Sequence, residues 1–215
     1  MKKTLLSLFL AMAVAAGASA AQQTEVDKGD RFDYKYPVFT QENPQAAQRM
    51  NRDIQKMISK SRKDLRQPDM RAVGSNYEVI YENDQFVCLT FNTWYYYDKA
   101  AHGMYYTHGI VYDKDTGKRV PYTRFMEKLN AEQLKQDIKA KKLPVYGADL
   151  KTVSEAPFID NIDNFKVSKD YIITEDGHLY LMYQPYELDC YAAGVTCQSK
   201  ISIKKALLRI SCKEM

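Results

Sequence analysis

The sequence predicts an α+β protein: an antiparallel sheet with an amphipathic helix packed on it, and a second short helix in the connection. Two patterns favour this class. Residues 44–65 place apolar side chains at helical spacing, whereas residues 76–113 and 170–203 alternate apolar and polar side chains, as strands do. With 45% hydrophobic and 27% charged residues, the chain has the composition of a globular protein. Collagen-like and wholly disordered chains are therefore excluded.

Residues 1–20 are expected to be a signal peptide. Lys2 and Lys3 form a positive start, residues 5–16 form a short apolar run, and Ala18 and Ala20 are small residues suited to a cleavage site. The run is shorter than the ~20 apolar residues of a membrane-spanning helix. No cysteine follows it to carry a lipid. We therefore expect a periplasmic or secreted protein without a stable membrane anchor.

The charge balance argues against an electrostatic binder. The chain has 31 Lys+Arg against 27 Asp+Glu, a net charge of +4, and removal of Lys2 and Lys3 leaves 29 against 27, or +2. Proteins that bind nucleic acid through charge are usually more basic, so no nucleic-acid partner is expected. The unusual feature is 17 tyrosines against one tryptophan. Nothing in the composition indicates an oligomeric state.

Two regions are expected after the leader, residues 21–100 and residues 101–215, packed as one compact unit. In the first region, residues 21–30 are polar and are predicted to fray. Residues 32–39 favour an edge strand, because Pro37 cannot donate a ladder hydrogen bond.

The helix that follows has clear end signals. Asn43 suits the N-cap and Pro44 the first helical position, and the pattern ends near Pro68. A core-facing stripe is the simplest interpretation of its apolar side chains. The residues expected to be buried against the sheet are Ile54, Ile58 and Leu65.

Strands are predicted at 77–82, 85–97 and 104–113, with Asn83-Asp84 as the turn between the first two. One face of the 85–97 strand is apolar. The other face is mixed and is expected to be partly covered. The remaining elements are a short helix at 123–129, a helix at 131–142 capped by Asn130, irregular structure at 143–163, a hairpin at 170–174 and 178–188, a strand at 195–203 and a short helix at 204–210.

Four cysteines in an exported chain favour disulfides over free thiols, and three pairings are possible. A zinc site would need closer pairs, so no metal is predicted, and no motif indicates a cofactor. The segment 191–194 suits a tight connection that places Cys190 and Cys197 on one face. The expected bridge is therefore Cys190–Cys197, which leaves Cys88 to pair with Cys212.

Several motifs then occur in a fixed order. They are Tyr36-Pro37-Val38-Phe39, Met50–Ile54, Ala101-His102-Gly103, Thr116-Gly117-Lys118, Tyr183–Glu187 and Tyr191–Gly194. Over residues 34–203 this order resembles the exported bacterial DUF3298/DUF4163 family, with residues 21–100 similar to DUF4163 and residues 101–215 similar to DUF3298. Ala100, Cys190 and Lys204 depart from the family pattern.

That family includes the extracellular domain of a lysozyme-sensing anti-sigma factor and an accessory domain of a peptidoglycan deacetylase. The resemblance implies a location facing the cell wall, and a lysozyme-like protein or a cell-wall component as ligand. It carries over no enzymatic activity, because the deacetylase catalytic domain has no counterpart in this chain.

The leading hypothesis is therefore an exported, non-catalytic binding or sensing module of the bacterial envelope. Tyrosine gives a large contact area at low entropy cost, and its ring can stack on sugars. A tyrosine-rich core is the competing interpretation, because neighbours on a strand alternate between faces. The candidate ligand-binding residues are Trp94, Tyr96, His102, Tyr105, Tyr106, Tyr186 and Tyr191.

The alternative is a small enzyme that modifies wall glycans, using His102 or the Glu187/Asp189 pair. A titratable partner within hydrogen-bond reach of His102 would favour the enzyme. Gly103 suggests a positive φ at this turn, in which case His102 has a structural role. His108 and His178 are interpreted as ordinary strand residues.

Overall fold

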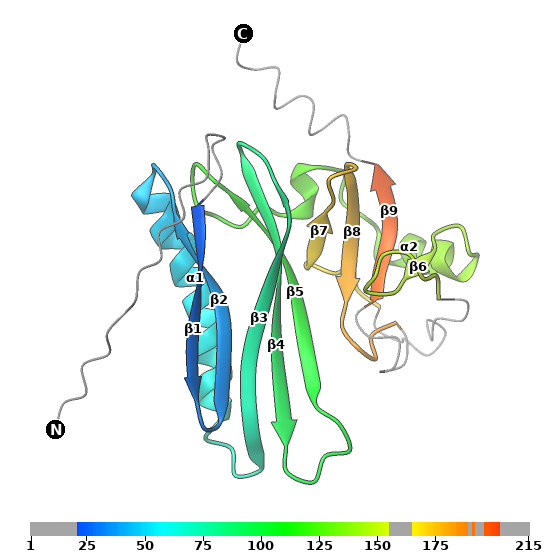
Figure 1. The fold of residues 1–215 in the computed structure, drawn as a ribbon. Coiled ribbons are helices and arrows are strands. Elements are labelled where there is room, and N and C mark those ends of the chain that lie inside the picture. Colours follow the sequence, from blue (N-terminus) through cyan, green and yellow to red (C-terminus); the bar gives the residue numbers. More distant parts are fainter. Residues whose placement is uncertain (1–20, 155–164, 189–190, 192–195, 203–215) are drawn as a thin grey trace, which may run out of the picture.

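The computed structural model describes residues 21–154, 165–188, 191 and 196–202. Over these residues the chain forms two sheets and two α-helices, which confirms the α+β class (Figure 1). The predicted signal peptide and the predicted helix at 204–210 lie outside the described residues. No helix in the described part of the chain is both long enough and apolar enough to cross a membrane.

The larger sheet has five strands in the order β1-β2-β3-β4-β5. They are β1 (Ala21–Gly29), β2 (Phe32–Thr40), β3 (Met70–Glu82), β4 (Phe86–Tyr97) and β5 (Met104–Asp113). The β3–β4 and β4–β5 pairs are antiparallel, as predicted, and so is β1–β2, but β2 pairs with β3 in parallel, which makes the sheet mixed. The reason is the helix between β2 and β3. It acts as a crossover that carries the chain back to the end of the sheet where β2 began, so that β3 runs parallel to β2.

The N-terminal strand is a correction. Residues 21–29 do not fray, because each pairs with a residue of β2, from Ala21 with Thr40 to Gly29 with Phe32. β1 is therefore the edge strand and β2 lies inside the sheet. Pro37 is accommodated there because β3 pairs with β2 only over Phe32–Tyr34, so Pro37 lies beyond the parallel ladder.

The second sheet has four antiparallel strands in the order β6-β9-β8-β7. They are β6 (Val145–Tyr146), β7 (Tyr171–Ile173), β8 (His178–Tyr183) and β9 (Thr196–Ser202). The predicted hairpin and last strand are present, but they form a sheet of their own and do not extend the first one. The segment expected to be irregular, 143–163, contributes the short β6.

Helix α1 (Pro44–Asp64) begins and ends close to its predicted limits. The Asn43 side chain accepts hydrogen bonds from the backbone N–H groups of Gln45 and Ala46, which caps the helix. Ile54 and Ile58 are buried as expected, whereas Leu65 is only half-buried. Helix α2 (Ala131–Lys139) is shorter than predicted, and the helix expected at 123–129 is a 3₁₀ turn at Tyr122–Arg124.

Two cores lie on opposite faces of the larger sheet. α1 covers one face, where Ile54 packs among Tyr34, Phe39 and Leu89. The four-stranded sheet covers part of the other face, where Cys88 is enclosed. Gly109 permits this contact, because a Cβ there would lie 2.4 Å from the backbone oxygen of Tyr171. β4 is consequently buried on both faces at its start and open on one face at its end.

Cys88 is a free thiol with no exposed surface. Its Sγ accepts a hydrogen bond of 3.2 Å from the backbone N–H of Ile173, and burial raises its pKa to about 12. A bridge to Cys212 would require the tail to enter this core. The free thiol of Cys88 contradicts the predicted Cys88–Cys212 bridge. Cys190 and the side chain of Cys197 lie outside the described residues, so the Cys190–Cys197 bridge stays a prediction.

We expect Cys88 to resist alkylation by iodoacetamide in the folded protein at pH 8, because the reactive thiolate is suppressed by burial. The same residue should be modified after unfolding in urea. Peptide mapping under non-reducing conditions measures this residue by residue. Rapid modification of folded Cys88, or a Cys88 peptide linked to the Cys212 peptide, would contradict the enclosed free thiol.

Candidate functional site

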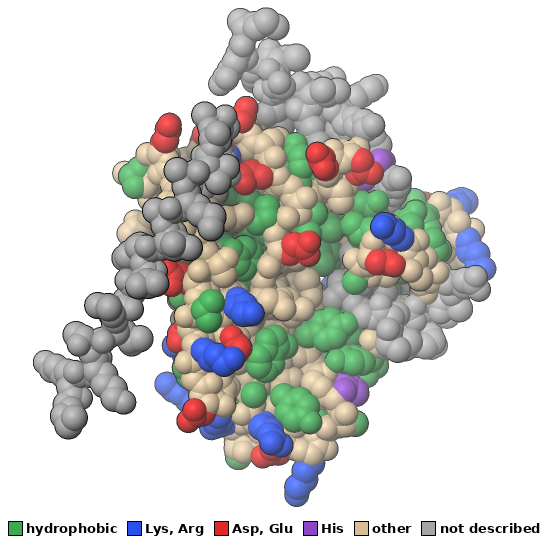
Figure 2. Space-filling view, in the orientation of Figure 1, with side chains coloured by type: hydrophobic (Ala, Val, Ile, Leu, Met, Phe, Trp, Pro, Cys, Tyr) green, Lys and Arg blue, Asp and Glu red, His purple; other side chains and the backbone are tan. Residues whose placement is uncertain are grey.

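Aromatic side chains gather on the face of the larger sheet that is turned away from α1. Figure 2 shows hydrophobic side chains over the lower ends of β3 to β5 on this side. The second sheet covers only the other end of these strands, so the rings are left accessible. We call this surface the aromatic face, and its members are Trp94, Tyr96, His102, Tyr105, Tyr186 and Tyr191.

Tyr191 is the centre of the aromatic face. Its ring stacks on His102 with centroids 3.9 Å apart, and it meets the rings of Tyr105 and Tyr186 at 5.7 and 5.8 Å. Its hydroxyl donates a hydrogen bond to the backbone oxygen of Gly103. Such ring pairs stabilise beyond the area they bury, so Tyr191 joins the 98–103 loop, β5 and the segment after β8 into one surface.

The contacts of His102 indicate a structural role. Its Nδ1 lies 2.9 Å from the backbone oxygen of Gly103, and no carboxylate among the described residues bonds to it. The expected positive φ at Gly103 was wrong, because Gly117 and Gly177 are the described glycines with that conformation. Space at Gly103 is nevertheless tight, since a Cβ there would lie 3.1 Å from the backbone oxygen of Tyr95.

Trp94 and Tyr96 come from the end of β4 and differ in their surroundings. The indole of Trp94 lies directly over Gly74, where an added Cβ would be 2.3 Å from a ring carbon. Trp94 is half-buried, whereas Tyr96 is 38% exposed, with the guanidinium of Arg71 5.9 Å from the centre of its ring. Tyr96 therefore offers an accessible ring whose loss would leave no cavity.

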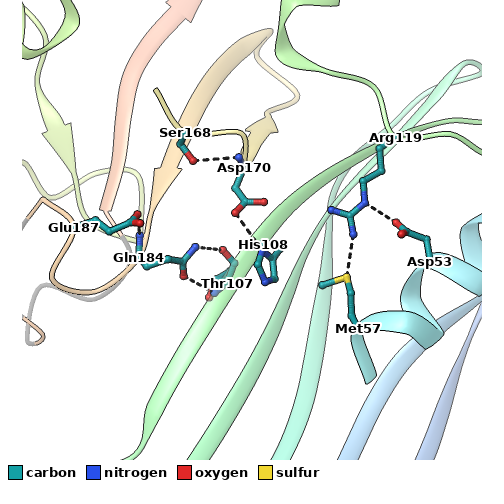
Figure 3. Close-up of polar contacts among 9 residues, drawn as sticks. All are labelled: Asp53, Met57, Thr107, His108, Arg119, Ser168, Asp170, Gln184 and Glu187. Carbon is teal, nitrogen blue, oxygen red and sulfur yellow. Dashed lines mark hydrogen bonds and ion pairs between the residues drawn. The ribbon is translucent and has the colours of Figure 1, made fainter. Parts of the chain in front are cut away.

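Tyr186 is the most exposed ring of the aromatic face, at 60%, and its φ of 70° is in the left-handed region. That conformation is costly for a tyrosine and is often found where a side chain has to be presented. Glu187 holds the turn, because its carboxylate accepts a hydrogen bond of 2.7 Å from the backbone N–H of Gln184 (Figure 3). The Gln184 side chain in turn pairs with both backbone groups of Thr107 on β5.

This role of Glu187 bears on the proposed carboxylate pair. One oxygen of Glu187 is used in the turn, and Asp189 lies outside the described residues. No three His, Cys, Asp or Glu side chains in the described ranges come together as metal ligands.

Tyr106 belongs to the opposite face. It pairs with Thr93, one position along from the Trp94–Tyr105 pair, so its ring points to the α1 side of the sheet. There it lines a groove of about 470 Å³ between α1 and the ends of β4 and β5. Residues that line this groove include Lys60, Asp64, Tyr95, Tyr106, His108 and Arg119.

Two polar pairs beside this groove were not anticipated from the sequence (Figure 3). His108 Nδ1 lies 3.1 Å from a carboxylate oxygen of Asp170, and Arg119 donates through Nε to the carboxylate of Asp53. His108 is therefore more than an ordinary strand residue. No sequence signal links these pairs, because their members are 62 and 66 residues apart.

Comparison with known proteins agrees with this fold. Residues 119–199 match a family described as "Protein of unknown function (DUF3298)". A crystal structure of a DUF3298 family protein from Pseudomonas aeruginosa has a TM-score of 0.53 and 15% sequence identity, covering 87% of this chain and 90% of that chain. A family member from Bacteroides fragilis has a TM-score of 0.49 and 11% identity, with the same coverage. No curated protein matches. The similarity of residues 21–100 to DUF4163 stays a prediction.

Proposed function

Residues 119–199 match the DUF3298 family, and we propose that the protein is an exported, non-catalytic binding module of the bacterial envelope that uses the aromatic face. The observation that carries this proposal is the ring cluster around Tyr191. It assembles side chains from β5, from the 98–103 loop and from the segment after β8 on a surface that α1 and the second sheet leave uncovered.

The geometry suits recognition because much of the surface is ordered before a ligand arrives. Tyr105 is held by its strand, and Tyr191 is held by the stacked His102 and by the bond to Gly103. Rigid tyrosines lose little entropy on binding, which is why they are frequent at the centres of protein interfaces. The exposed rings of Tyr96 and Tyr186 supply the accessible contact area.

The candidate ligands follow from the family resemblance. A lysozyme-like protein is the more specific candidate, and a cell-wall component is the second. Both fit tyrosine chemistry, because an amphipathic ring packs equally on a protein surface and on a sugar. Export remains part of this proposal and depends on residues 1–20.

The test is direct binding of the mature chain, residues 21–215, to lysozyme and to soluble peptidoglycan fragments. Tyr186→Ala and Tyr96→Ala should each weaken binding by about tenfold or more, as expected for interface tyrosines. Their melting temperatures should change little because both rings are exposed. Val26→Ala, at an apolar residue on β1 that is about as exposed as Tyr186, is the control and should bind normally.

Trp94→Ala is a poorer probe, because removal of its ring from Gly74 should also lower stability. Unchanged affinity in both tyrosine variants would show that the aromatic face is not the binding surface. Failure of lysozyme and wall fragments to bind the intact chain would reject both ligands.

The enzyme alternative makes a different prediction. It requires release of new products from peptidoglycan, detected by mass spectrometry, and loss of that release in His102→Gln. We expect no product from the intact chain, since His102 stacks on Tyr191 and bonds to the backbone of its own loop. Product release that depends on His102 would replace the binding proposal with the enzyme.

A further inference from the structure

Helix α1 carries a row of cations that the fold leaves in solvent. Arg49, Arg52, Lys56, Lys60 and Lys63 follow at intervals of three and four residues, and all are exposed. At about 100° per residue they lie within an arc of roughly 80°, along about 20 Å of helix. The two acids of α1, Asp53 and Asp64, are half-buried and lie outside this arc.

The row continues onto the turn after β5. Lys118 and Arg119 join Arg49, Arg52 and Lys56 around a shallow hollow of about 260 Å³. The one carboxylate in the lining of that hollow, Asp53, is already bonded to Arg119 and to the hydroxyl of Tyr112. Among the described residues, none forms an ion pair with Arg52, Lys56, Lys60, Lys63 or Lys118.

Like charges three and four residues apart destabilise a helix, by about 0.2–0.5 kcal/mol for each pair. A row of such pairs is unfavourable unless an anion neutralises it. The mature chain has a balance of only +2, so this concentration is a local feature and not a consequence of overall charge.

The hollow lies next to the groove described above, because Arg119 lines both. In the groove the Tyr106 ring is 42% exposed and rests edge-to-face on Tyr95, with centroids 5.9 Å apart. Lys60 and His108 lie in the same lining. An exposed ring with polar groups around it is the arrangement that binds a sugar.

We propose that this surface binds an acidic polysaccharide: a sugar ring stacks on Tyr106 in the groove, and successive anionic groups lie along the cations of α1. The guanidinium groups of Arg52 and Arg49 match carboxylate or sulfate oxygens in pairs. A polyphosphate would use the cations but has no ring for Tyr106. A neutral glycan would use Tyr106 but would leave the row unpaired. The acidic glycan is the class that uses both features, on the side of the sheet opposite to the aromatic face.

The probe is a set of alginate oligosaccharides, polymers of uronic acid, titrated into the mature chain by calorimetry at 50 and 200 mM NaCl. Binding should weaken with salt, since charge neutralisation contributes to it. Lys56→Gln with Lys60→Gln should weaken binding about tenfold, and Tyr106→Ala should do so by a similar factor. Lys35→Gln, an exposed lysine on β2, is the matched control.

Dextran serves as the neutral glycan and sodium polyphosphate as the ringless polyanion. The proposal is overturned by absence of alginate binding, by equal affinity for dextran, or by alginate binding that Tyr106→Ala leaves unchanged. Polyphosphate that binds as tightly as alginate would show that the cations of α1 bind any polyanion, and this result would also overturn the proposal. The result is independent of the aromatic face, because neither the probes nor the variants are shared with that test.

Discussion

Replacing Gly109 with alanine should destabilise the protein by about 3 kcal/mol, near the upper end of the usual cost of overpacking. The added Cβ would lie 2.4 Å from the backbone oxygen and 2.6 Å from the carbonyl carbon of Tyr171, and 2.7 Å from Met182 Sδ. Backbone atoms cannot move aside as a flexible side chain can. The clash therefore has to be relieved by separating β7 from β5. Urea unfolding followed by circular dichroism measures the change.

The matched control is Gly147→Ala, where the nearest atom to the new Cβ is 3.5 Å away, an ordinary contact. It should change the free energy of unfolding by less than about 0.5 kcal/mol. Gly109→Ala should also weaken binding at the aromatic face, because Gln184 ties the turn that carries Tyr186 to β5. If Gly109→Ala were as stable as Gly147→Ala, the two sheets could not pack as closely as described.

The second large effect concerns the other core. Ile54→Ala should lower the free energy of unfolding by about 2–5 kcal/mol, because the side chain has no exposed surface and its loss leaves a cavity under α1. Gln55→Ala, the exposed neighbour on the same helix, should be within about 0.5 kcal/mol of the parent. Equal stability of the two variants would mean that α1 does not pack on the sheet through this face.

Local patterns in the sequence determined the elements whose signals lie within a few residues. Asn43 and Pro44 mark the start of α1 because an N-cap is made by atoms two and three residues away. Ile54 and Ile58 identify its buried side for the same reason. β5 was also predicted at its observed limits, since alternation over ten residues is a strand signal in itself.

The partners of the strands were decided by the tertiary structure. A polar β1 is stable because β2 supplies hydrogen bonds along its whole length, which no property of residues 21–29 reveals. The separate second sheet follows from its packing across β4 and β5, where Gly109 allows close approach. That packing also decides which part of the mixed face of β4 is covered and which part remains accessible.

The candidate site was likewise determined in part by local sequence patterns and in part by the tertiary structure. The sequence by itself identified all six residues of the aromatic face as candidates. It also placed Trp94 and Tyr96 on the less apolar side of their strand, because alternation is a local property. Only the tertiary structure brings the Tyr191 ring onto His102 and its hydroxyl to Gly103, which lies 88 residues earlier in the sequence. It also assigned Tyr106 to the groove, through a register that depends on β4. Contacts between distant segments depend on how whole elements pack, and no short stretch of sequence contains that information.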